Sequence, residues 1–199
     1  MTHVAIIDSG GANIASLLYA FERLQTKAVL TTDADVIRSA SRVVLPGVGA
    51  AKDAMTRLTD AGLIDVIREL TQPVLGICLG MQLLCAGSEE EDVACLGIIP
   101  GTALKLSATP DYPVPNMGWC ATSITADNPM LFEITSGSYF YYLHSYALPI
   151  SDSTLAIATH AEDFSAMVGH KNFIAAQFHP ERSAARGAQL LRNFLGSRA

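Results

Sequence analysis

The first 87 residues alternate between short apolar runs rich in β-branched residues and longer stretches whose apolar residues have helical spacing. The strand-like runs are 3–8, 28–32, 42–50 and 73–77, and the helix-like stretches are 14–25, 33–40, 51–71 (with a break near Gly62) and 79–87. Such βαβ repetition predicts a mostly parallel sheet, because parallel neighbours need a crossover connection and a helix usually supplies it. Helices should then cover both faces of that sheet.

The second half of the chain has a different sequence pattern. Its segments from about 91 to 160 are short and are punctuated by Pro, Gly, Asn and Asp, which indicates hairpins. Residues 173–180 are predicted to form one more buried strand, and residues 184–195 a closing helix. We therefore expect a single α/β domain over 1–199, with a mixed, mostly parallel central sheet flanked by helices and a β-rich antiparallel extension in the second half.

Composition excludes several classes of protein. Half of the residues are hydrophobic, 16% are charged and the net charge is −6, which is typical of a globular chain without a nucleic-acid-binding stripe. The apolar runs are too short for a membrane span, and the N-terminus lacks the pattern of a secretion signal, so we expect a cytoplasmic protein. The four cysteines form no C-x-x-C pair, and H-E-x-x-H and G-x-G-x-x-G are absent, so we expect no metal, disulfide or dinucleotide cofactor.

One cysteine stands at an unusual corner. Cys78 lies in Gly76-Ile-Cys-Leu-Gly80, at the expected passage from a strand into a helix. This is the spacing of a nucleophile elbow, with Cys in place of Ser. Glycines on both sides remove Cβ atoms that would clash at so sharp a turn, and the helix N-terminus favours thiolate over thiol. We expect the other three cysteines to pack mainly as small buried hydrophobes.

A thiolate hydrolase needs a base and a group that orients the base. His179 follows an apolar strand, which places it at the carboxyl edge where Cys78 should also lie, and Glu181 stands two residues later on the same side. By contrast, His160 and His170 flank a hairpin or loop and are expected on the surface, and His3 lies at the opposite edge. The Leu79 amide and the glycine-rich turn 46–50 could supply an oxyanion hole.

The segments "PGVG" (46–49), "GICLGMQLL" (76–84) and "FHPERS" (178–183), in this order and spacing, resemble the class I (triad) glutamine amidotransferases. The resemblance covers essentially the whole chain. It implies that Cys78, His179 and Glu181 form a catalytic triad that hydrolyses the side-chain amide of L-glutamine through a thioester, releasing ammonia. It further implies that Gly47, Val48 and Gly49, with Leu79, form the oxyanion hole.

Within this family, "PNMGW" (115–119), "YLHSY" (142–146) and "HPERS" (179–183) resemble the glutaminase subunits of imidazole glycerol phosphate synthases of histidine biosynthesis. The chain is about one bare amidotransferase domain long, so the resemblance implies that ammonia passes to a separate (β/α)8 cyclase subunit in a heterodimer. It assigns glutamine binding to Gln82, His144, Ser145 and Tyr146. It assigns the partner interface and ammonia passage to a further set: Asn13, Met117, Trp119, Tyr141 and Arg182.

The chain departs from that pattern at Ala12, Cys120 and Arg182, where Gly, Asn and Lys are usual. All three are expected near the interface, so they bear on coupling to the partner and not on the triad. Three other functions stay open. They are a class I glutaminase for another synthase (anthranilate or pyridoxal phosphate type), a Cys-dependent hydrolase of esters or peptides, and a non-catalytic subunit that keeps only the fold.

Overall fold

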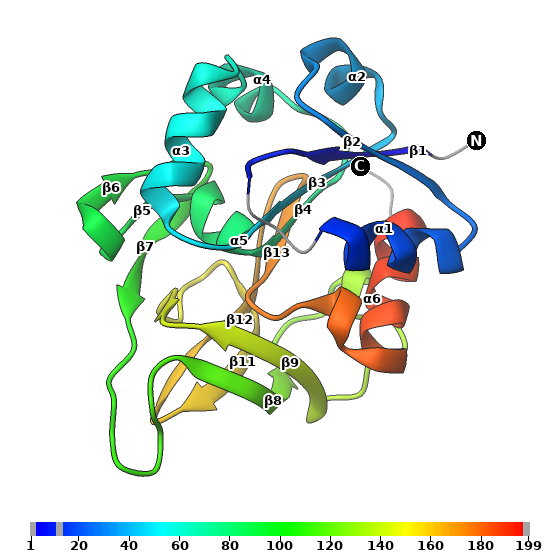
Figure 1. Cartoon of the computed structure of the whole chain (residues 1–199). Coiled ribbons are helices and arrows are strands. Elements are labelled where there is room, and N and C mark those ends of the chain that lie inside the picture. The colour runs from blue at the N-terminus through cyan, green and yellow to red at the C-terminus, as the bar shows by residue number, and fades with distance from the viewer. Residues whose placement is uncertain (1–2, 11–13, 197–199) are drawn as a thin grey trace.

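A computed structural model of the chain describes residues 3–10 and 14–196. Its main feature is a nine-stranded sheet with the order β2-β1-β3-β4-β13-β12-β11-β8-β9 (Figure 1). The parallel part consists of β1 (His3–Ile7), β2 (Lys27–Thr31), β3 (Arg42–Gly47), β4 (Val74–Cys78) and β13 (Phe173–Ala176). The antiparallel part consists of β12 (Glu162–His170), β11 (Thr154–His160), β8 (Asn116–Ile124) and β9 (Ser138–His144). The predicted mixed sheet with an antiparallel extension is confirmed.

Helices cover both faces of the parallel part. On one side lie α1 (Ile14–Arg23) and α6 (Ala184–Gly196), and on the other lie α2 (Ala34–Ser39), α3 (Ala51–Asp60), α4 (Ile64–Arg68) and α5 (Leu79–Leu84) (Figure 1). The alternation along β1 shows how one strand serves both layers. Val4 and Ile6 pack with α1 and α6, whereas Ala5 and Ile7 pack with α2 to α5. Successive side chains of a strand point to opposite faces, so a strand buried on both sides must be apolar throughout.

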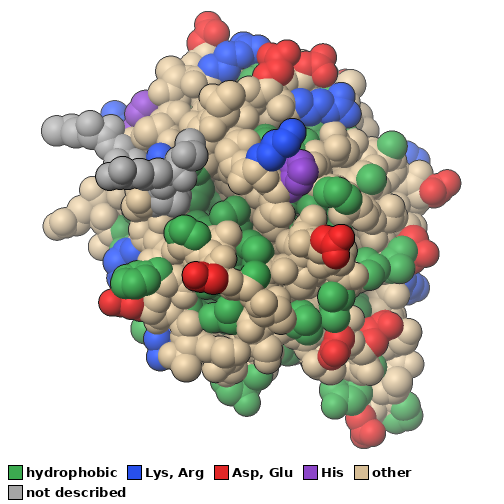
Figure 2. Space-filling view, turned by 180° about the vertical axis from the view of Figure 1, so that it is seen from behind, with side chains coloured by type: hydrophobic (Ala, Val, Ile, Leu, Met, Phe, Trp, Pro, Cys, Tyr) green, Lys and Arg blue, Asp and Glu red, His purple; other side chains and the backbone are tan. Residues whose placement is uncertain are grey.

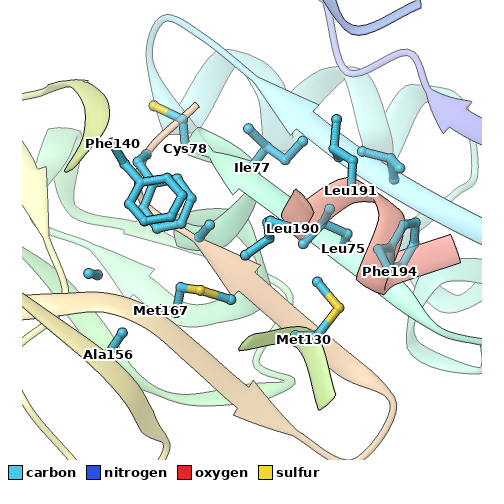
Figure 3. Close-up of a cluster of buried hydrophobic side chains, with 14 of the residues drawn as sticks. Leu75, Ile77, Cys78, Met130, Phe140, Ala156, Met167, Leu190, Leu191 and Phe194 are labelled. Atoms are coloured by element: carbon cyan, nitrogen blue, oxygen red, sulfur yellow. The ribbon is translucent and has the colours of Figure 1, made fainter. Parts of the chain in front are cut away.

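The layer beneath α6 forms a continuous core that reaches the corner at Cys78. In Figure 3, Ile77 of β4 lies between the Cys78 sulfur and the α6 side chains Leu190 and Leu191, and Leu75 lies farther from Cys78, beside Leu190. Phe140 and Phe178 stack at this end of the core, with their ring centroids 4.1 Å apart. The nucleophile candidate therefore stands on rigid, close-packed elements.

A second, smaller sheet was not predicted. It has the order β10-β7-β5-β6 and is built from β5 (Cys85–Ser88), β6 (Val93–Ala94), β7 (Ile99–Lys105) and β10 (Tyr146–Ala147). The expected helix 79–87 is consequently wrong at its end, because the chain turns extended at Cys85, which pairs with Ile99 of β7. A Cβ atom at Gly87 would lie 2.9 Å from the Val93 carbonyl oxygen, so glycine permits this close pairing.

The last parallel strand is also shorter than predicted. β13 ends at Ala176, whereas the expected strand continued to Pro180. Beyond it, Gln177 N donates to Ala166 O of β12 at 2.9 Å, which extends the pairing with β12 by one residue. His179 N donates instead to Tyr141 O of β9 at 2.9 Å, so the chain has left its ladder by His179. Three short 3-10 helices complete the described elements, namely η1 (Glu90–Asp92), η2 (Pro129–Leu131) and η3 (Pro180–Arg182). No helix in the described part of the chain is long and apolar enough to cross a membrane.

Candidate active site

The corner at Cys78 has the strained backbone that the sequence predicts. β4 ends at Cys78 and α5 begins at the next residue, and Cys78 has φ 53° and ψ −109°. A non-glycine residue with positive φ is uncommon, and such strain occurs where the surroundings hold it in place for function. Cys78 is 6% exposed, and its sulfur lies at one end of a cavity.

The two flanking glycines have different neighbours. A Cβ atom at Gly80 would overlap the Leu45 carbonyl oxygen on β3, and a Cβ atom at Gly76 would lie 2.8 Å from the Leu84 side chain and 3.0 Å from the Ala175 Cβ. Strand β3 and helix α5 can therefore approach each other only because position 80 has no side chain. Strands β3 and β4 pair in a register that places Gly47 opposite Cys78.

His179 and Glu181 lie beside this corner. His179 Nδ1 is 2.8 Å from Glu181 Oε1, and the two side chains are 7% and 5% exposed. Burial, the largest influence, acts to lower the pKa of His179. The hydrogen bonds and negative charges of Cys78 and Glu181 outweigh burial and raise that pKa to about 10. The arrangement favours an imidazolium held between a thiolate and a carboxylate, which is the charge pattern of an activated cysteine.

Glu181 has one further property. Its Oε2 atom is buried and has no hydrogen-bond partner among the described residues. Glu181 borders a small cavity of about 10 Å³ that Gly47, Val48 and His179 also line. The Gly47 end of the turn therefore contacts the cavity beside the acid of the candidate triad.

The turn after β3 lies alongside the nucleophile. Gly49 has φ +90° with open space beside it, and Val48 is 37% exposed. Helix α3 starts at Ala51, directly after this turn. Backbone amides from the turn and from Leu79, the first residue of α5, are thus close to Cys78, as an oxyanion hole requires.

A cavity of about 230 Å³ joins these groups. This is smaller than a typical drug-sized pocket, which suits an amino-acid ligand. It is lined by Val48, Gly49, Cys78, Leu79, Gln82, Glu90, Leu143, His144, Ser145, Tyr146, His179 and Arg182. A larger groove of about 890 Å³ lies elsewhere, between the end of β8, η2 and the end of α6, and its lining contains no Cys or His.

Glu90 is the one acidic residue of the cavity lining that sequence reasoning missed. It stands in the acidic run 89–92, and such a run ordinarily indicates a solvated turn. In the structure, Glu90 Oε2 accepts a hydrogen bond from the Ala51 amide at 3.1 Å. Helix α3 has no side-chain cap at its own Ala50, so Glu90 supplies the missing acceptor and is thereby held at the cavity wall.

Three of the four predicted glutamine-binding residues, Gln82, His144 and Tyr146, meet at the Tyr146 carbonyl group, and Ser145 lines the same cavity. Gln82 Nε2 donates to Tyr146 O at 3.0 Å, and His144 Nδ1 donates to the same oxygen at 2.9 Å. His144 Nε2 lies 3.1 Å from Asn116 Nδ2 and accepts from it. Burial is the main cause that lowers the pKa of His144 to about 4, so the ring is neutral and serves to hold the 144–146 backbone.

Three of the predicted interface residues, Met117, Trp119 and Tyr141, lie on the outer face of the β8–β9 pair, and Arg182 of η3 lies against it. Trp119 pairs with Tyr141 across the strands, their ring centroids are 6.2 Å apart, and Arg182 Cζ lies 4.3 Å from the centroid of the Tyr141 ring. Met117 and Trp119 are 68% and 51% exposed. Asn13 and Ala12 lie outside the described residues.

This outer face adjoins the cavity through β9. Leu143 pairs with Met117 on the exposed side, and its carbonyl oxygen lies 3.6 Å from Cys78 Sγ. One strand therefore connects the nucleophile to an exposed apolar surface.

Cys120 follows Trp119 on β8 and, because neighbouring strand residues alternate, faces the core side, where its Sγ donates to Asn116 Oδ1 at 3.5 Å. One expectation about a single residue needs correction. His160 is buried and not on the surface, with Nε2 2.7 Å from Pro113 O and its ring against Tyr112.

The two remaining cysteines lie in surroundings that disfavour the reactive thiolate form. Cys85 and Cys95 are buried, as predicted, and burial raises the pKa of both thiols, that of Cys95 to about 11. All four cysteines are free. In the described ranges, no group of three or more His, Cys, Asp or Glu side chains is arranged to hold a metal ion.

The chain resembles known proteins over nearly its whole length. The family model "Glutamine amidotransferase class-I" matches residues 5–197. The chain is 48% identical over 195 residues to "Imidazole glycerol phosphate synthase subunit HisH" of Xylella fastidiosa (strain Temecula1), covering 98% of each chain. It is 50% identical over 192 residues to "Imidazole glycerol phosphate synthase subunit HisH 2" of Legionella pneumophila (strain Paris), covering 96% of each.

The fold is shared more widely. A solved structure of a glutamine amidotransferase aligns with a TM-score of 0.74 at 16% identity, covering 97% of each chain. A second solved structure, of PurLQS from Thermotoga maritima, aligns with a TM-score of 0.71 at 16% identity, covering 98% of each chain. From the whole-length family match and the full-length relatives, this chain belongs to the class I glutamine amidotransferase family.

Proposed function

We propose that this chain is the glutaminase subunit of an imidazole glycerol phosphate synthase, acting in the cytoplasm in histidine biosynthesis. The observation that carries the proposal is the arrangement of the three candidate triad residues: Cys78 and His179 line one cavity, and Glu181 bonds to the His179 ring from behind. Full-length relatives that bear the HisH subunit name support the choice of synthase. The substrate is L-glutamine and the products are glutamate and ammonia.

In the reaction we propose, the Cys78 thiolate attacks the side-chain carbonyl carbon of glutamine. The developing oxyanion receives hydrogen bonds from the Leu79 amide and from an amide of the 47–49 turn. His179 gives its proton to the amide nitrogen as the C–N bond breaks, so the leaving group departs as ammonia and a γ-glutamyl thioester is left.

The second half of the reaction releases the enzyme. His179, now neutral, takes a proton from a water molecule that attacks the thioester, and the C–S bond breaks to give glutamate and the thiolate. Glu181 holds the imidazole through Nδ1 and stabilises its charged form during both steps.

Substrate recognition follows from the polar groups around the cavity. The Glu90 carboxylate and the Gln82 amide face the space where the amino-acid end of glutamine would lie, and the 144–146 backbone lines the same wall. A carboxylate suits the α-ammonium group by charge, and the Arg182 guanidinium suits the α-carboxylate. These assignments extend the glutamine-binding set to include Glu90.

The partner in this proposal is a (β/α)8 cyclase subunit that docks on the outer face of β8 and β9. Exposed Met, Trp and Tyr side chains there match the residue types that are enriched at protein interfaces. The contact between the Leu143 carbonyl oxygen and Cys78 Sγ, at 3.6 Å, supports ammonia release beside this face. Figure 2, which shows the rear of the molecule, has Lys and Arg side chains scattered among Asp and Glu side chains.

The test is glutamate release from glutamine by the purified chain, with and without a barrel cyclase and its nucleotide ligand. Gly49 has open space beside it, so we infer that the backbone amides of the turn point at the oxyanion only when the nucleotide-loaded cyclase docks. We therefore expect very little glutamate release by the isolated chain and strong stimulation by the nucleotide-loaded cyclase. Glutamate release that does not depend on the cyclase would support the glutaminase chemistry but assign the chain to another synthase. No release in any mixture would favour the non-catalytic alternative.

A further inference from the structure

Two buried amides connect the Tyr146 carbonyl to the nucleophile. Gln82 Nε2 donates to Tyr146 O at 3.0 Å and to Gln177 Oε1 at 3.3 Å, and Gln177 Nε2 donates to Cys78 Sγ at 3.8 Å. The bonds run in series from a backbone carbonyl on one wall of the cavity to the sulfur on the other.

The carbonyl determines the direction of every bond in the series. A carbonyl oxygen can only accept, so the Gln82 atom beside Tyr146 O must be the NH₂ group. That group also faces Gln177, whose atom there must be its oxygen. The NH₂ group of Gln177 is then the one that faces Cys78. No alternative orientation of either amide satisfies all three contacts.

The Tyr146 carbonyl is itself held in place. His144 Nδ1 donates to it at 2.9 Å, and Asn116 anchors the far side of the His144 ring. Gln177 is fully buried and Gln82 is 4% exposed, so neither amide can exchange these partners for bulk water. The orientation of the Gln177 NH₂ group is therefore built into the fold.

We propose, on the basis of the glutaminase function above, that Gln177 is a positioning residue of the reaction. Its N–H stabilises the Cys78 thiolate, and its Oε1 holds Gln82 so that the Gln82 oxygen is presented to the substrate. That oxygen accepts no hydrogen bond within the described part of the chain, and Gln82 lines the cavity. It is thus available to an N–H of glutamine.

Other groups also act on Cys78. The His179 side chain, with Glu181 behind it, interacts with the thiolate, the Leu143 carbonyl faces the sulfur, and Glu90 and Arg182 share the cavity. A Gln177 variant leaves all of these in place. A change in the reactivity of the Cys78 thiol caused by the variant therefore reports on Gln177 and its two hydrogen bonds.

Two variants separate the role of Gln177 as a donor to Cys78 from its role as an acceptor for Gln82. Gln177→Met keeps the side-chain length and removes both functions, whereas Gln177→Glu keeps an acceptor for Gln82 and places an acceptor in front of the sulfur. Gln189→Met is the matched control, because among the described residues the Gln189 side chain bonds only to Asn193 and Arg192 on α6. Circular dichroism and thermal unfolding establish that each variant is folded.

The first readout is the rate of Cys78 alkylation by iodoacetamide as a function of pH, followed by mass spectrometry of the Cys78 peptide. A hydrogen bond to a charged group is worth about tenfold in the thiolate equilibrium, so we expect Cys78 in Gln177→Met to react about tenfold more slowly near neutral pH. Its pH midpoint should rise by about one unit. Gln177→Glu should be slower still, and Gln189→Met unchanged.

The second readout is steady-state glutamine hydrolysis by the complex with the loaded cyclase. We expect Gln177→Met to lower kcat and raise KM, and Gln82→Met to act mainly on KM. Unchanged alkylation profiles in both Gln177 variants would overturn the proposal, and if Gln177→Met does not fold, Gln177→Glu decides alone. Alkylation needs no turnover, so a wild-type complex that releases no glutamate would refute the proposed function and leave the Gln177 result to stand by itself.

Discussion

Gly80 of α5 lies so close to Leu45 of β3 that a Cβ atom at position 80 would overlap the Leu45 carbonyl oxygen. The atom that would be hit belongs to backbone within the sheet, so it cannot move aside as a flexible side chain can. This single contact sets the distance between the nucleophile corner and the strand that carries the glycine-rich turn.

We therefore predict that Gly80→Ala destabilises the protein by about 3 kcal/mol or more, because overpacking against fixed backbone is among the costliest substitutions. Urea unfolding measures the loss. Gly196→Ala is the control, since an added Cβ there meets nothing within 4 Å. Equal stability of the two variants would show that the corner is looser than the structure indicates.

The second prediction concerns Cys78. Cys78→Ser and Cys78→Ala should reduce glutamine-dependent synthesis by the complex at least about 10³-fold, as removal of a nucleophile does in other triads. Synthesis supplied with ammonium salts should survive, because the cyclase chemistry lies in the partner. Cys120→Ser is the matched control, and simultaneous loss of both activities in the Cys78 variants would contradict this division of labour.

The third prediction concerns the charge on His179. Its folded-state pKa of about 10 lies above the unfolded value of about 6.5. Its contribution to stability is therefore fully present below pH about 6.5 and is lost as the pH rises through about 10. In Glu181→Gln the imidazolium loses one anionic partner, so the pKa should fall and the stability deficit relative to wild type should be larger at pH 6 than at pH 9.5.

NMR titration of the His179 ring and urea unfolding at the two pH values measure these effects. Glu22→Gln, on the exposed side of α1, controls for the loss of one surface charge. An unchanged His179 titration in Glu181→Gln would mean that the 2.8 Å contact does not act on the ring.

The fourth prediction concerns His144, whose pKa is shifted in the opposite direction from that of His179. Its folded-state pKa of about 4 lies below the unfolded value of about 6.5, so the unfolded state binds the extra proton between these values. The free energy of unfolding should fall as the pH drops from about 6.5 towards 4. His144→Gln should flatten this slope, whereas His3→Gln, which removes an imidazole far from the network, serves as the comparison in urea unfolding at pH 7 and 4.5.

The fifth prediction concerns the outer face of β8 and β9. Trp119→Ala should weaken binding of the cyclase by about 2 kcal/mol, roughly 30-fold in Kd, because exposed Trp residues are frequent hot spots. Stability of the isolated chain should change little, since Trp119 is half exposed. Phe132→Ala removes a similarly exposed aromatic ring from a different part of the surface, and calorimetric titration of both variants with the cyclase compares them. Equal losses would argue against docking on β8 and β9.

Local sequence patterns were sufficient for the parallel half of the fold and for the elbow. Each βα unit there has its own periodicity, and the requirement for glycine at 76 and 80 follows from the sharpness of the turn. The family and the fold class predicted from the sequence are confirmed. The single-domain boundary and the roles of the site residues stay predictions, although the structure brings Cys78, His179, Glu181 and Gln82 to one place.

Long-range pairing decided the rest. Cys85 leaves its helix because it pairs with Ile99 of β7, and the chain leaves the β13 ladder where His179 N bonds to Tyr141 O of β9. Such partners are distant in sequence, and nothing in a local window reveals them. For the same reason the sequence did not identify Glu90 and Gln177 as site residues. Glu90 stands in an acidic run that is typical of a solvated turn, and Gln177 stands in an apolar strand-like segment. Their chemistry depends on Ala51 and Cys78, which only the tertiary structure brings within hydrogen-bonding distance.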